Sequence, residues 1–176
     1  MQDAQARPVE LQVGDLLPTL LTYDADGRPE TLLQGARTTT LGYGADGRLE
    51  TVTDAEGSTT ALARDAIGRV TAKTLPGGAS VAFGYDENGN LTSVTPPGRP
   101  AHEMSYTPAD LLESETTPAM GTLPRITTHA WDGDRLPTVL TLPSGRTVTT
   151  AYDAAGRPAN TTFDGDTITM SYLPTT

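Results

Sequence analysis

The carboxylates of the stretch "TYDADGRPE", residues 22–30, lie close enough in sequence to suggest an oxygen-rich calcium loop. An EF-hand loop needs the pattern D-x-[DN]-x-[DN]-G and a glutamate at its twelfth position. Asp24, Asp26 and Gly27 do not follow that spacing, and related stretches carry alanine in the same segment, at Ala45, Ala66 and Ala155. We therefore predict turn-forming aspartates, no bound metal and no cofactor.

The two histidines offer a second kind of chemistry, because a histidine held beside serine and aspartate can act as a general base. His102 and His129 fall in different copies of the repeat described below, and the chain has no G-x-S-x-G nucleophile motif. We therefore predict structural or surface histidines, no catalytic residues and no enzymatic activity. The sequons at Asn90 and Asn160 receive no role, since such triplets occur often by chance.

Charge and composition exclude several further classes of protein. The 176 residues carry a formal net charge of −10 and no cysteine. Nucleic-acid binding rests largely on Lys and Arg that neutralise phosphates, so no nucleic-acid partner is expected. Disulfides and thiolate metal sites are excluded, and the chain shows neither a signal-peptide pattern nor the roughly 18 consecutive apolar residues of a membrane span.

A repeated phrase organises the chain. The opening stretch returns as "GYGADGRLE", "GYDENGNLT" and "AYDAAGRPA". Aligning these copies gives one anchor residue in each: Tyr23, Tyr43, Arg64, Tyr85, Tyr106, Trp131, Tyr152 and Tyr172. The spacings are 20, 21, 21, 21, 25, 21 and 20 residues. A period this regular is typical of a repeat array.

Most copies carry a glycine four residues after the anchor, usually followed by arginine, and the fullest copies read Asp-x-x-Gly-Arg after the anchor. The residues that complete this motif are Asp24, Gly27, Arg28, Gly47, Arg48, Gly68, Arg69, Asp86, Gly89, Asp153, Gly156 and Arg157. The copies at Tyr106 and Trp131 depart from this pattern. After Tyr106, Asp110 stands where glycine is expected, and after Trp131 the sequence "WDGDRL" is interpreted as one residue short.

The motif predicts a β-hairpin. The aspartate can accept hydrogen bonds from backbone amides ahead of it, and glycine supplies the positive φ that lets the next strand leave in register. Replacing such a glycine with alanine is expected to cost about 1 kcal/mol or more. A second set of turns recurs between the copies, at Gly35, Gly57 and residues 76–78, 96–98, 143–145 and 164–166. Each repeat thus holds two strands and two turns.

The residues before each anchor alternate as strand residues do. Two positions before the anchor stand mostly bulky side chains, such as Leu21, Leu41 and Phe83, whereas the adjacent position is always small. This period of two predicts strands with one bulky and one small face, and the fold class is all-β. At the exceptional anchor Arg64, we expect the stem to cover apolar surface and the guanidinium to reach water or a nearby aspartate.

With Tyr-Asp-x-x-Gly-Arg recurring about every 20 residues, the chain resembles the YD-repeat or Rhs-repeat family of bacterial Rhs proteins, the C component of Tc toxins, and animal teneurins. The resemblance covers roughly residues 19–176, taken as an array of about eight copies, and leaves residues 1–18 as an N-terminal segment that caps the array or is flexible. It implies an extended, curved or spiralling sheet of consecutive antiparallel hairpins. In complete members this sheet closes into a hollow shell.

The function implied by the resemblance is a non-enzymatic scaffold that encloses or displays a toxin or other polypeptide. The partners are then the rest of a larger shell or its cargo, and exposed edge strands favour self-association. The implied location is secreted or at the cell surface, in a bacterium. No Asp-Pro pair is present, so self-cleavage is not expected. The alternative is a module that binds carbohydrate or a partner protein through the curved sheet, since aromatic side chains can stack on sugars.

Overall fold

The computed structural model describes residues 1–118 and 125–173, and every regular element in these ranges is a β-strand. In chain order the strands are β1 (Glu10–Leu11), β2 (Thr19–Tyr23), β3 (Pro29–Gln34), β4 (Arg37–Tyr43), β5 (Leu49–Thr53), β6 (Thr59–Arg64), β7 (Val70–Thr74), β8 (Ser80–Tyr85), β9 (Leu91–Thr95), β10 (His102–Tyr106), β11 (Leu112–Thr116), β12 (Ile126–Trp131), β13 (Pro137–Thr141), β14 (Thr147–Tyr152), β15 (Pro158–Phe163) and β16 (Asp166–Thr169). No helix in these ranges is long and apolar enough to cross a membrane.

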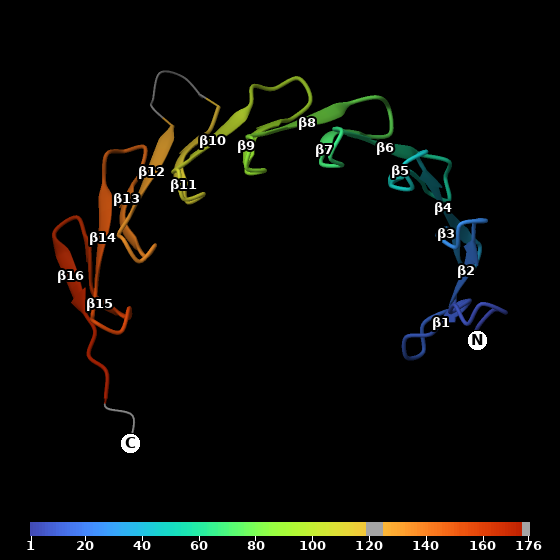
Figure 1. The fold of residues 1–176 in the computed structure, drawn as a ribbon, viewed down its shortest axis with the longest axis horizontal. Coiled ribbons are helices and arrows are strands. Elements are labelled where there is room, and N and C mark those ends of the chain that lie inside the picture. Colours follow the sequence, from blue (N-terminus) through green and yellow to red (C-terminus); the bar gives the residue numbers. More distant parts are fainter. Residues whose placement is uncertain (119–124, 174–176) are drawn as a thin grey trace. The chain divides into compact units, whose positions relative to one another are not determined.

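Each strand pairs with the strands that precede and follow it in the chain, so the order across the sheet is the order in the sequence (Figure 1). The pairs are antiparallel, as in β2 and β3, where Leu21 lies opposite Leu32 and Thr22 opposite Thr31. The predicted all-β array of consecutive antiparallel hairpins is therefore confirmed. The chain divides into two compact units, residues 1–82 and 83–176.

The turns after the anchors have the predicted geometry. The Gly27 amide donates to the Asp24 carbonyl at 3.0 Å, the Asp24 amide donates to the Arg28 carbonyl at 2.9 Å, and Gly27 has a φ of 82°. The register shifts by one residue between Thr22 and Tyr23, which is a bulge beside the turn. The same two backbone bonds close the turns that begin at Gly44, Asp65, Asp86, Thr107, Asp132 and Asp153.

The turns at the other ends of the strands are of several kinds. The turn from Asp54 to Ser58 repeats the bonds just described, with Gly57 at a φ of 80°. Two hairpins are tighter. Gln34 lies opposite Arg37 across a two-residue turn, and Phe163 lies opposite Asp166 across Asp164 and Gly165, which both have positive φ as a type I′ turn requires.

Each unit has one bulky and one small face, as the alternation predicts, because directly opposed residues of paired strands share a face. Thr22 and Thr31, on the small face, lie with their Oγ1 atoms 2.6 Å apart. In the first unit the small face carries a threonine row across β2 to β6: Thr22, Thr31, Thr40, Thr53 and Thr59. In the second it carries a hydroxyl row across β10 to β14: Ser105, Ser114, Thr128, Thr141 and Thr147.

No side chain in residues 1–118 and 125–173 is fully buried, so the array has no interior core in this part of the chain. The bulky face is half-buried at best, as at Leu21, Leu41 and Leu62. Stability of a repeat array rests on the terms between neighbouring repeats. The contacts that join one hairpin to the next are therefore where the stabilising interactions have to be found.

The structure also places a turn of the repeat type within the N-terminal segment. In the stretch "QDAQARP", residues 2–8, the Asp3 amide donates to the Arg7 carbonyl and the Ala6 amide to the Asp3 carbonyl, each at 3.0 to 3.1 Å. Ala6 takes the glycine position with a φ of 61°. Gln2 stands 21 residues before Tyr23, at the anchor position. The boundary at residue 18 stays a prediction, and this turn belongs to the geometry of the array.

Candidate functional site

The anchor side chains join successive hairpins. The Tyr43 hydroxyl donates a hydrogen bond of 2.7 Å to the carbonyl of Pro29, the first residue of β3 in the preceding hairpin. The equivalent bond, to the carbonyl of the residue that follows the preceding turn, is made by Tyr23, Arg64, Tyr106, Trp131, Tyr152 and Tyr172. The remaining predicted anchor, Tyr85, ends β8 and is half-buried. The anchor therefore acts between repeats as well as within its own.

This bond explains which residue types occupy the anchor position. Tyrosine, tryptophan and arginine share a flat group that ends in a hydrogen-bond donor, so each can cover the preceding hairpin and satisfy a backbone carbonyl. Phenylalanine lacks that donor and stands at none of the eight predicted anchors. The repeat pattern alone did not predict this bond. The donor that the anchor side chains share is the signal that would have indicated it.

Arg64 corrects the expectation that its guanidinium reaches water or an aspartate. Its Nη1 donates to the carbonyl of Gly68 at 3.0 Å and its Nη2 donates to that of Leu49 at 3.3 Å. Leu49 is the first residue of β5, so Arg64 makes the bond that tyrosine makes elsewhere. Its Nε is withdrawn from water without a partner in the described residues. The side chain lies against the sheet, so two backbone carbonyls accept hydrogen bonds from its guanidinium in place of water.

The aspartate and arginine of one turn form a second recurring contact. Asp24 Oδ1 accepts the amides of Asp26 and Arg28 at 3.0 and 2.8 Å, while its Oδ2 accepts Arg28 Nε at 2.7 Å. The hydrogen bond from the Arg69 side chain lowers the pKa of Asp65, and the hydrogen bond from the Arg157 amide lowers the pKa of Asp153. These carboxylates are held ionised inside their turns, which is a structural use of the charge.

The arginine then reaches the following repeat. Arg28 lies over the ring of Tyr43 with its Cζ 4.6 Å from the centroid, and its Nη2 donates to Asp26 Oδ2 at 2.8 Å. We call this arrangement the guanidinium clamp: two carboxylates of one turn and the ring of the next anchor around one guanidinium. Arg7 over Tyr23 and Arg157 over Tyr172 repeat the stacking at 4.3 and 4.1 Å. Cation–π contacts of this kind stabilise by about 0.5–1 kcal/mol at exposed positions.

The motif glycine has a second purpose beyond its positive φ. A Cβ at Gly68 would overlap the guanidinium carbon of Arg48 from the preceding turn, whereas one at Gly57, in the same type of turn, would meet no atom within 4 Å. The φ values of the two glycines are 93° and 80°. Backbone strain is thus matched at the two sites, and only Gly68 also makes room for an arginine.

Gly68→Ala is therefore expected to destabilise more than its matched control Gly57→Ala. The control should lose about 1 kcal/mol through backbone strain alone, and Gly68→Ala somewhat more, because the half-exposed end of Arg48 must also move. Urea denaturation followed by far-UV circular dichroism measures both. Equal losses in the two variants would show that the close approach of Arg48 contributes nothing.

The copy at Trp131 is not one residue short, which corrects the sequence alignment. The Asp132 amide donates to the Leu136 carbonyl, and the Arg135 amide donates to the Asp132 carbonyl, as in a complete turn. Arg135 occupies the glycine position with a φ of 64°, and Leu136 occupies the arginine position. Arg135 stands one residue earlier in its turn than the arginine of the other copies, so in the sequence this copy looked one residue short. Asp110, at the glycine position of its turn, has a φ of 60° in the left-handed region.

The copy that begins at Tyr85 replaces the arginine with an amide. Asn90 Nδ2 donates to Asp86 Oδ2 at 3.0 Å and to Asp110 Oδ1 of the following turn at 2.8 Å. Asn88 Nδ2 donates to the same Asp110 oxygen at 2.8 Å. The link between neighbouring turns is kept with neutral donors, and the hydrogen bond from the Asn90 side chain lowers the pKa of Asp86.

The two histidines do not meet a catalytic partner among the described residues. His129 stacks on Trp131 with the ring centroids 6.5 Å apart, and its Nε2 has no hydrogen-bond partner there. His102 begins β10 and is exposed. No group of three His, Asp or Glu side chains in residues 1–118 and 125–173 is arranged to hold a metal ion. On the tyrosines Tyr23, Tyr43 and Tyr172 an arginine covers one ring face, where a sugar would otherwise stack.

Comparison with known proteins gives one match by family and several by structure. The family model described as the teneurin YD-shell matches residues 1–176. No curated protein matches the chain in a sequence search. The crystal structure of TcdB2-TccC3-TEV matches with 15% identity and a TM-score of 0.47, over 92% of this chain and 12% of that chain. A Photorhabdus luminescens Tc holotoxin pore with a mutation in TccC3 gives the same four values, so the chain spans about an eighth of these matched chains.

Proposed function

Because the chain belongs to the teneurin YD-shell family, we propose that it is a non-enzymatic stretch of β-shell that encloses or displays another polypeptide in the complete protein. The observation that carries this proposal is the repeated link between hairpins. Every anchor whose bond is described above donates to the same carbonyl position of the preceding repeat, from Tyr23 to Tyr172. Such uniform links suit a wall that extends by adding copies, and the partners are further repeats or the enclosed chain.

The location proposed with this function is secreted or at the cell surface of a bacterium. The net charge of −10 suits a surface that stays soluble while its strand edges are exposed. Recognition of a glycan or partner protein by the sheet remains the alternative, and a glycan-array screen of the chain with no saturable ligand would remove it.

Limited proteolysis of the complete natural protein that contains these 176 residues tests the enclosure. We expect a polypeptide segment that survives protease in the native protein and is degraded once the shell is unfolded in denaturant, with mass spectrometry identifying the segment. A protein in which every segment outside the repeats is cleaved at the same rate with and without denaturant would overturn the proposal.

Self-association through an unpaired edge belongs to the same proposal. β16 has no strand on its outer side within the described residues, all four of its residues are exposed, and Ile168 is 67% exposed. An exposed edge with an apolar residue is a template for pairing with another chain.

Light scattering should therefore show a mass that rises with concentration, and Ile168→Lys should reduce that rise because a charged edge resists pairing. The control is Ile67→Lys, which changes an equally exposed isoleucine in a turn away from the edge. A strictly monomeric chain over a wide concentration range, or equal effects of both variants, would contradict edge pairing.

A further inference from the structure

One guanidinium clamp retains its ligands but has lost its arginine. In the turn after Trp131, Asp132 and Asp134 stand where Asp24 and Asp26 hold Arg28, and Tyr152 stands where Tyr43 lies under that guanidinium. Leu136 occupies the arginine position. The three groups that surround a cation elsewhere in the sheet are therefore present here around an aliphatic side chain.

The acceptor atoms of this clamp are unused within the described residues. Asp132 Oδ1 accepts the amides of Asp134 and Leu136, both at 2.9 Å, just as Asp24 Oδ1 does in its own turn. Asp132 Oδ2 and the Asp134 carboxylate, which correspond to the two oxygens that bind Arg28, have no hydrogen-bond partner there. The Tyr152 hydroxyl donates to the Pro137 carbonyl as in the other repeats, and no cation of the described part of the chain lies over its ring.

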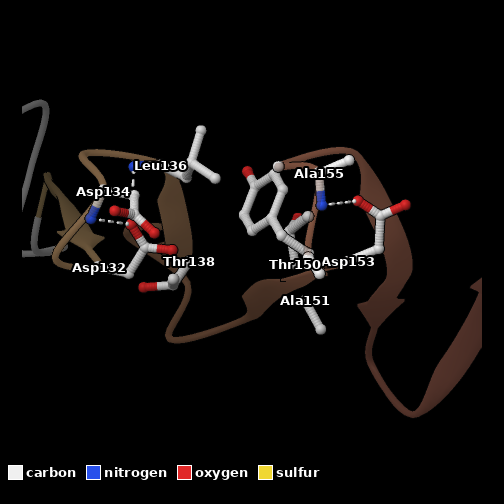
Figure 2. A pocket seen from close by; sticks show the side chains of 11 residues that line it. Asp132, Asp134, Leu136, Thr138, Thr150, Ala151, Asp153 and Ala155 are labelled. Carbon is white, nitrogen blue, oxygen red and sulfur yellow. Dashed lines mark hydrogen bonds between the residues drawn. The ribbon is translucent and has the colours of Figure 1, made fainter.

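A hollow of about 610 Å³ lies between the two turns and is lined by all of these groups, among them Asp132, Asp134, Leu136 and Tyr152. Figure 2 shows Asp132, Asp134 and Thr138 on one side of the hollow, with Thr150, Asp153 and Ala155 on the other.

The other two copies that lack the arginine do not form such a site. After Tyr85, the amide of Asn90 bridges to Asp110 and so replaces the guanidinium. After Tyr106, Thr107 replaces the aspartate and Ala109 the second carboxylate, so Leu111 at the arginine position leaves no charge uncompensated. Among these three copies, as far as the structure describes them, only the one with Leu136 combines two carboxylates without a cation and an uncovered ring.

We infer that the clamp formed by Asp132, Asp134 and Tyr152 binds an arginine side chain supplied by another polypeptide. The Arg28 clamp shows the geometry, with Asp24 on Nε, Asp26 on Nη2 and the ring of Tyr43 below the guanidinium. Guanidinium suits this site better than ammonium, because its flat fork can hydrogen-bond two carboxylates while stacking on an aromatic ring. A chain of net charge −10 also attracts a basic segment at long range.

The test is a titration of the isotope-labelled chain with N-acetyl-L-arginine methylamide, followed by ¹H–¹⁵N NMR. We expect weak but saturable shifts at the amides of Leu136 and Ala155. The uncharged citrulline analogue should produce none. Asp132→Asn keeps the oxygen that accepts the turn amides but removes the charge, and should weaken binding about tenfold. Leu136→Arg restores the clamp from within the chain and should abolish binding.

The matched control is Leu111→Arg, which places an arginine at the same position of a turn without the carboxylates and should leave binding unchanged. No saturable shift in the wild-type chain, or equal binding by the wild type and Leu136→Arg, would overturn the inference. Binding that appears only after Arg135→Ala would show that the chain's own arginine fills the clamp and would likewise overturn a partner. The spectrum of Leu136→Arg reports its folding directly.

Discussion

Replacing Tyr43 with alanine is expected to lower the free energy of unfolding by about 2–3 kcal/mol. The ring is half-buried between hairpins, its hydroxyl donates to Pro29 at 2.7 Å, and Arg28 covers its face at 4.6 Å. Truncation of a fully buried aromatic residue costs about 3–5 kcal/mol, and partial exposure reduces that figure here. Urea denaturation followed by far-UV circular dichroism measures the loss.

Tyr43→Phe separates the hydrogen bond from the packing, because phenylalanine keeps the ring and the cation–π contact but leaves the Pro29 carbonyl without its donor. The expected loss is about 1 kcal/mol. A Tyr43→Phe variant as stable as the wild type would show that water replaces the hydroxyl at no cost. In that case the anchors would act by packing alone, and the recurrence of donors at this position would need another cause.

The secondary structure was predictable because its signals are local. Alternation around Leu21 and Leu41 determines which residues share a face, and the glycine four residues after an anchor determines where φ becomes positive, as at Gly27 and Gly47. Asp110 adopts the left-handed conformation at the glycine position, which aspartate tolerates better than most residues. The family followed from the spacing of the same residues.

The contacts between repeats were not predictable from a motif read one copy at a time. The bond from Tyr43 to Pro29 joins residues 14 apart, and the contact from Arg28 to Tyr43 joins residues 15 apart, so neither lies within one phrase. The turn from Asp3 to Arg7 was not predicted because it lacks both the aromatic anchor and the glycine, with Gln2 and Ala6 in their places. Its signal was the pair Asp3 and Arg7, four residues apart and 21 residues before the next such pair.

Acid should destabilise the array progressively, because the pKa values of six turn carboxylates are lowered from 3.8. These are Asp3, Asp24, Asp46, Asp65, Asp86 and Asp153. In the folded chain such a group stays ionised at a pH at which the unfolded chain already takes up a proton. Stability from these groups is therefore complete well above pH 3.8 and is lost as the pH falls through 3.8 toward the lower folded values.

The measurement is the urea midpoint as a function of pH between about 6 and 2.5. Asp65→Asn should flatten the acid limb, because one of the six groups no longer titrates. Added salt distinguishes the two causes of the lowered carboxylate pKa, which are the ion pair with arginine and the hydrogen bonds from backbone amides. Exposed ion pairs such as that of Asp153 and Arg157 are screened by salt, while the backbone amides that donate to Asp153 Oδ1 are not. An acid limb that persists in high salt would therefore assign the stabilisation to the amide hydrogen bonds of the turn. A urea midpoint that does not change down to pH 2.5 would contradict both the ion pairs and the amide hydrogen bonds as sources of stability.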